Sequence, residues 1–142
     1  MVKYGEFTIG QTFKSNSIIL TKEKIMEFAS EFDPQYMHLD EEKANAGLFK
    51  GIIASGIQTL AISFKLWIET KTYEEDIIAG TELNNVKFMK PVYPEDELYT
   101  VAEVVDLDGT RKSTGIVTVR LSTFNQTGLK VFEGELSAIV RK

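Results

Sequence analysis

One long apolar helix, followed by β-rich segments, limits what this chain can fold into more than any other feature of its sequence. Apolar residues recur at helical spacing between positions 57 and 68 and form one wide stripe, made of Ile57, Leu60, Ala61, Phe64, Trp67 and Ile68. A helix with such a stripe must bury it against another layer of secondary structure. We expect the residues that face this layer to be Ile57, Leu60, Ala61, Phe64 and Ile68.

The second half of the chain supplies that layer. Its segments are rich in valine, isoleucine, threonine and phenylalanine and span residues 81–89, 97–106, 115–125 and 129–141, with one or two further strands expected at residues 7–13 and 17–20. Asp108-Gly109 and Thr127-Gly128 are turn signals, and short turns join antiparallel strands. The sequence therefore predicts an α+β fold in which one helix covers an antiparallel sheet. Open strand edges in such a small sheet also favour at least a homodimer.

Two shorter helices are predicted before the long one. Thr21 is suited to cap a helix that ends before Pro34, and Asp40 is suited to cap a short helix that stops at Gly47. Residues 33–39 carry a proline and no regular apolar spacing, so we predict that they form no regular element. Side chains on a loop of this kind are favoured for function over packing.

Length and composition exclude several classes of protein. The chain has 142 residues, which fits one domain over residues 1–142, and its formal charge of -5 argues against a nucleic-acid partner. It contains no cysteine, so disulfides, thiolate zinc sites and cysteine nucleophiles are excluded. Residues 1–7 lack a signal-peptide pattern, and no apolar stretch approaches about 20 residues. We therefore expect a cytoplasmic protein that does not cross a membrane.

Asp33 and His38 form the first candidate site, separated by four residues on the predicted loop. His38 is the only histidine, so imidazole chemistry can take place only there. A carboxylate and an imidazole can share a water molecule and transfer its protons, and the unperturbed pKa of histidine, about 6.5, lies near neutral pH. In the structural alternative, Asp33 caps a helix or turn and His38 lies on the surface. One histidine with scattered carboxylates does not make a metal site, and no phosphate-binding or dinucleotide motif is present, so we expect neither metal nor cofactor.

The start of the long helix is the second candidate site. Ser55 and Gln58 have the spacing of a capping box, which puts Gly56 and Ile57 in the first turn. The N–H groups of a first turn have no partners within the helix, so they can bind a developing negative charge such as an enolate oxygen. The structural alternative is an ordinary capped core helix, and capping explains Ser55 better than a role as nucleophile.

Lys87 and Lys90 form a third and weaker candidate, before the proline turn of residues 91–94. They are placed to meet phosphates or carboxylates of a ligand, although lysines in such positions are more often simply solvated.

Taken together, these segments resemble the MaoC-like dehydratase family, which includes the (R)-specific enoyl-CoA hydratases. The resemblance begins at FTIGQTF (residues 7–13), continues through the Asp-x4-His spacing of Asp33 and His38, and includes the small residues and glycine of residues 53–56. It ends with VKFMKPVYPEDELYTVAEV (residues 86–104), which is similar to the family's strand, proline turn and following strand. Nearly the whole chain is covered.

The resemblance implies a hotdog fold, a dimer with its active site at or near the subunit interface, and an acyl thioester of coenzyme A or acyl carrier protein as substrate. It also implies that Asp33 and His38 are the catalytic pair and that the Gly56 N–H polarises the thioester carbonyl. The expected activity is therefore the reversible hydration of enoyl thioesters, or the dehydration of 3-hydroxyacyl thioesters.

The sequence departs from the family pattern around the candidate pair. The family usually has Asn and then Pro where this chain has Gln35 and Tyr36, and many members have His where this chain has Ser55. The acidic turn of residues 94–96 also differs from the usual Gly-Asp form. Two alternative functions follow: a hotdog acyl-CoA thioesterase, or a non-catalytic subunit that binds an acyl thioester.

Overall fold

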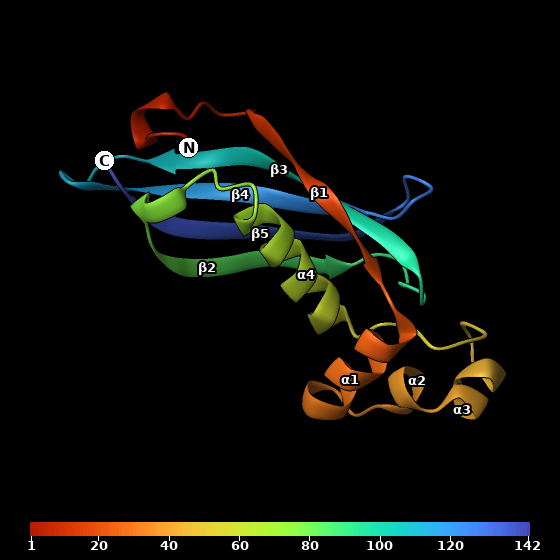
Figure 1. Cartoon of the computed structure of the whole chain (residues 1–142). Helices are drawn as coiled ribbons and strands as arrows, with labels where there is room; N and C mark the ends of the chain where they lie inside the picture. The colour runs from red at the N-terminus through yellow and green to blue at the C-terminus, as the bar shows by residue number, and fades with distance from the viewer.

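The computed structural model describes residues 1–142 and contains one five-stranded sheet with a helix across one face (Figure 1). The strands are β1 (Thr12–Leu20), β2 (Ile77–Phe88), β3 (Asp96–Asp108), β4 (Thr114–Phe124) and β5 (Lys130–Arg141). Their order in the sheet is β1-β3-β4-β5-β2, and every neighbouring pair is antiparallel. The α+β prediction and its four C-terminal strands are confirmed, whereas the two N-terminal segments contribute the single strand β1.

One helix lies across a face of the sheet, and the other three lie beyond the N-terminal end of that helix (Figure 1). The four helices are α1 (Lys22–Phe32), α2 (Tyr36–Leu39), α3 (Glu41–Ala46) and α4 (Gly56–Ile68), with short 3-10 turns at Tyr4–Glu6 and Glu74–Asp76. In Figure 1, α4 crosses the sheet, and α1, α2 and α3 gather beyond the N-terminal end of α4. Side-chain caps from Thr21 on α1 and Asp40 on α3 confirm both predicted helix starts. No helix is long and apolar enough to cross a membrane.

The core lies between α4 and the sheet, because inward-facing buried residues alternate along the strands with residues that face outward. Every second residue of β4 is buried, and Val117, Val119 and Leu121 on this face are at most 3% exposed. Leu66 and Trp67 of α4 belong to the same hydrophobic cluster as these residues and are nearly fully buried as well. Alternation of this kind is the period of a strand that has one face on a core.

The predicted sheet-facing stripe of α4 was wrong. Of that set, Ile57, Ala61, Phe64 and Ile68 are exposed and Leu60 is half-buried, while the buried residues are Gln58, Thr59, Ile62, Ser63, Leu66 and Trp67. The buried face tolerates its hydroxyls because they are hydrogen-bonded: Ser63 donates to the Thr59 carbonyl at 2.8 Å, and its Oγ lies 2.5 Å from Thr123 Oγ1 on β4. The helix is apolar on two faces, so periodicity alone did not select the one that packs.

The capping box was also only partly right. Ser55 is the N-cap of α4, and its Oγ accepts the Ile57 N–H at 3.2 Å. Gln58 does not reach back to the cap. Its side chain donates instead to the Lys24 carbonyl of α1 at 3.1 Å, and this bond ties the two helices together beside the loop that follows α1.

Candidate active site

Asp33 and His38 stand on a tight connection between α1 and α2. Pro34 follows the last turn of α1, which ends with the Asp33 N–H donating to the Ala29 carbonyl at 2.9 Å. The chain then closes one helical turn, in which the His38 N–H donates to the Gln35 carbonyl at 3.1 Å. Residues 36–39 are therefore helical, which corrects the prediction that residues 33–39 contain no regular element. The turn brings the two side chains to the same point.

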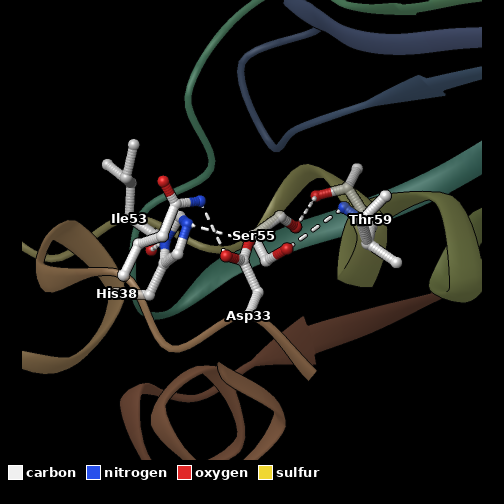
Figure 2. A network of polar contacts seen from close by, with 7 residues as sticks. Asp33, His38, Ile53, Ser55 and Thr59 are labelled. Carbon is white, nitrogen blue, oxygen red and sulfur yellow. Dashed lines mark hydrogen bonds and ion pairs between the residues drawn. The ribbon is translucent and has the colours of Figure 1, made fainter. Parts of the chain in front are cut away.

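The two side chains contact each other directly (Figure 2). His38 Nε2 lies 3.2 Å from Asp33 Oδ2, and His38 Nδ1 lies 2.6 Å from the carbonyl oxygen of Ile53. The His38 side chain is only 6% exposed and that of Asp33 is 17% exposed. Nδ1 is thus bonded to the Ile53 carbonyl and Nε2 lies against the Asp33 carboxylate, so His38 is not on the surface as the structural alternative required, although Asp33 is also the C-cap of α1.

The surroundings of Asp33 favour its charged form. A hydrogen bond from the Ser55 hydroxyl lowers the pKa of Asp33 most. Burial has the next largest effect and raises it, and the Gln35 amide and protonated His38 lower it further. The Gln35 Nε2 donates to Asp33 Oδ1 at 2.7 Å. Donors that face a carboxylate stabilise its ionised state, so Asp33 carries its negative charge at neutral pH.

The start of α4 faces the same point. Ser55 is fully buried and stands between Asp33 and the Ile57 N–H, to which it is bonded. The Gly56 N–H has no partner within the chain. A Cβ at Gly56 would lie 2.8 Å from the Phe88 ring, so only glycine fits here without displacing that ring. Of the first-turn residues predicted to bind a ligand, Gly56 thus keeps a free donor, whereas the Ile57 N–H is occupied by Ser55.

A cavity of about 590 Å³ lies beside these groups. Its walls come from the segment between α1 and α4, from Phe88 to Val92, and from Val131. His38, Gln35 and Gly56 line it, while Asp33 and Ser55 lie behind this lining. Apolar side chains make up most of the remaining surface, namely Met37, Leu48, Phe49, Ile53, Phe88 and Met89 among others. The cavity can therefore hold an apolar chain whose polar end meets His38 and Gly56.

The structure separates the two lysines of the third candidate, Lys87 and Lys90. Lys90 lines the cavity, but Lys87 lies on the edge strand β2 opposite Glu133 of β5. Lys90 is exposed and is the only charged side chain in the cavity wall apart from the titratable His38. It is therefore the residue of this pair that can meet an anionic group at the cavity. No group of three or more histidine and carboxylate side chains that could hold a metal ion is present.

Sequence reasoning missed three contributors to this site. The Ile53 carbonyl that binds His38 is a backbone group, so the type of residue at this position does not predict the contact. Gln35 was noted only as a departure from a motif, although its amide bonds Asp33. Phe88 lies against Gly56 from a distant strand. Its position next to a proline turn was visible in the sequence, but its contact with a helix start was not.

Comparisons with known proteins point to the same family as the sequence motifs. The model of the MaoC like domain family matches residues 6–125. The uncharacterized protein YdeM of Bacillus subtilis (strain 168) is 63% identical over 141 residues, which are 99% of this chain and 100% of the relative. The 3-hydroxyacyl-thioester dehydratase Z of Mycobacterium tuberculosis is 31% identical over 114 residues, 76% of each chain. The crystal structure of the MaoC-like dehydratase from Rhodospirillum rubrum is 33% identical, covers 97% of this chain and 95% of its own, and superimposes with a TM-score of 0.89.

Proposed function

The chain belongs to the MaoC-like dehydratase family and has its hotdog fold, and from this premise we propose that it hydrates enoyl thioesters and, in reverse, dehydrates 3-hydroxyacyl thioesters. The observation that carries the proposal is the meeting of His38, backed by Asp33, and the free Gly56 N–H at one largely apolar cavity. The relative named as a 3-hydroxyacyl-thioester dehydratase supports the same reaction class.

Water activation follows from the hydrogen bond of His38 Nδ1. A carbonyl oxygen only accepts, so the bond to Ile53 requires a hydrogen on Nδ1. In the neutral ring, Nε2 is then an acceptor, and the ionised Asp33 Oδ2 beside it is a second acceptor. A water molecule has two O–H groups and can donate one to each. Its oxygen lone pairs are then directed away from the pair, toward a substrate in the cavity.

In the proposed reaction, His38 is the base and Asp33 its charged partner. The water oxygen bonds to the β-carbon while its proton passes to His38 Nε2, and the electrons of the double bond move onto the thioester oxygen. The Gly56 N–H stabilises that enolate oxygen, and Asp33 stabilises the imidazolium. The proton on Nε2 then passes to the α-carbon, which restores the carbonyl and the neutral ring. Dehydration is the same sequence reversed.

The substrate class follows from the walls of the cavity. An apolar acyl chain fits among Met37, Phe49 and Met89, with its carbonyl at Gly56. Lys90 at the same cavity suits an anionic carrier, which is coenzyme A or the phosphopantetheine of acyl carrier protein.

We further propose that the protein works as a homodimer. In the edge strand β2, every residue except Ile77 and Val86 is exposed, including Leu83 and Phe88. The unpacked face of α4 with Phe64 is exposed as well. A second copy that pairs with β2 would cover an open edge and an apolar helix face together.

The test is a panel of enoyl thioesters of increasing chain length, carried on coenzyme A and on acyl carrier protein. Absorbance of the conjugated double bond and release of free thiol are followed in the same sample. Hydration removes the absorbance without releasing thiol, and the reaction approaches equilibrium from either side. Thiol release as the main event would establish the thioesterase alternative, and binding without turnover would establish the non-catalytic one.

A further inference from the structure

Gln35 is hydrogen-bonded to both members of the Asp33–His38 pair. Its backbone N–H donates to the Asp33 carbonyl at 2.8 Å, and its carbonyl accepts the His38 N–H at 3.1 Å. Its side-chain amide donates to Asp33 Oδ1 at 2.7 Å. Because the two backbone bonds shape the turn, they persist with any residue except proline. The side-chain bond is therefore the one feature that depends on the identity of residue 35.

That bond acts on the oxygen of Asp33 that does not face His38. A carboxyl group rotates easily about its last side-chain bond, since that torsion has broad minima. With Oδ1 bonded to Gln35, Oδ2 is directed at His38 Nε2. We propose that Gln35 is a positioning residue, whose side chain orients the Asp33 carboxylate toward His38 and the reacting water. This proposal rests on the proposed hydration.

The same bond supports the charge of Asp33. The groups that act on this carboxylate are the Ser55 hydroxyl at the start of α4, the Gln35 amide on its own loop, and the His38 imidazole on α2. Only the imidazole among them titrates. Removing the Gln35 donor therefore raises the pKa of Asp33, and a cation in its place lowers that pKa.

Two variants test the proposal in opposite directions. Gln35→Met keeps the length of the side chain and removes the donor, so the pKa of the Asp33 carboxyl rises. At neutral pH kcat falls roughly tenfold with little change in KM, because orientation rather than binding is lost. Gln35→Lys keeps a donor and adds positive charge, so the pKa of the Asp33 carboxyl falls below its wild-type value. A merely structural residue would not give opposite shifts.

The matched control is Gln126, whose Nε2 donates to the carboxylate of Asp96 at 3.0 Å on the loop after β4. Gln126→Met removes the same kind of bond away from the cavity, and the pKa of the Asp33 carboxyl is expected to stay at its wild-type value. A shift in this control as large as that of Gln35→Met would overturn the proposal, because it would show a general loss of stability.

A direct readout of that pKa separates this proposal from the proposed function. The ¹³C signal of the Asp33 carboxyl, assigned by its absence in Asp33→Asn, is titrated in the wild type and in all three variants. If the wild type hydrates enoyl thioesters but kcat and the carboxyl titration stay unchanged in both Gln35 variants, Gln35 has no positioning role and the function stands. If the wild type hydrates nothing, the function fails. The carboxyl titration then still decides whether Gln35 controls the ionisation of Asp33.

Discussion

The Nδ1 atom of His38 lies 2.6 Å from the carbonyl oxygen of Ile53, on the segment that leads into α4. The same two segments are joined a second time, because the Ile53 N–H donates to the Met37 carbonyl at 3.1 Å. The imidazole is thus tied to the segment that also carries Ser55 and Gly56. This link fixes which ring nitrogen faces Asp33, and the proposed reaction uses that nitrogen as its base.

The first prediction concerns the tautomer of this imidazole. The neutral ring should carry its hydrogen on Nδ1, because Ile53 offers only an acceptor. Free histidine favours the other tautomer, so the two are easily distinguished by ¹⁵N chemical shifts. His38 is the only histidine in the chain, and its ring signals need no assignment. A hydrogen on Nε2 in the neutral ring would contradict the proposed direction of proton transfer.

The second prediction concerns stability in acid. Hydrogen bonds, first that of Ser55, hold the pKa of Asp33 in the folded protein below its ordinary value of 3.8. The ionised group therefore contributes stability that is fully present above that ordinary value and is lost as pH falls through the lower folded pKa. Asp33→Asn should consequently show a weaker fall in Tm between about pH 4 and pH 2 than the wild type. Asp106→Asn, at an exposed position of β3, serves as the control and should follow the wild-type curve.

The third prediction concerns assembly. Light scattering should give at least twice the chain mass of 16.0 kDa. Phe64→Asp places a charge on the exposed apolar face of α4, and it should yield a folded monomer with reduced turnover. Ile19→Asp makes the same change at an exposed residue of β1, on the opposite edge of the sheet, and should remain a dimer. A wild-type monomer with full activity would refute the dimer.

The fourth prediction concerns the helix start. In Gly56→Ala the new methyl group would lie 2.8 Å from the Phe88 ring, so the ring must move and the cavity beside the free N–H changes shape. Because Phe88 is 54% exposed, its ring can move toward solvent, so the loss of stability should stay near the lower end of overpacking costs, about 1 kcal/mol, and kcat/KM should fall as well. Phe88→Leu in the Gly56→Ala background should restore part of both losses. Gly5→Ala, where a Cβ meets nothing within 4 Å, should change neither Tm nor kcat/KM.

The fold was largely predictable because local signals agreed with the final packing. Caps at Thr21 and Asp40 and the β-rich segments after residue 80 act over short distances, so the sequence displays them directly. The face of α4 was not predictable. Ser63 is polar, yet it is buried because Thr59 and Thr123 satisfy its hydroxyl, and Phe64 is apolar, yet it is exposed in the single chain.

The sequence singled out the candidate residues but not their geometry. Asp33 and His38 were a weak candidate by spacing, the family resemblance implied their catalytic role, and the structure places them 3.2 Å apart. The groups that orient them come from elsewhere in the chain. The Ile53 carbonyl is bonded to Nδ1 of His38, and the Ser55 hydroxyl acts on the Asp33 carboxylate. Such contacts depend on how α1, α2 and the start of α4 meet, and no local pattern encodes that meeting.

The most direct measurement compares hydration of a short enoyl thioester by the wild type, Asp33→Asn, His38→Gln and the double variant, with Tm determined on the same preparations. Acid–base groups typically contribute about 10²–10⁴-fold in rate, so each single variant should lose turnover by that order. Tm at neutral pH should fall in Asp33→Asn only by the stabilisation that the wild type loses in acid, and it should stay near the wild-type value in His38→Gln. The double variant should lose little more than either single one, because both residues act on the same water. Undiminished hydration by His38→Gln would contradict the assignment of the pair.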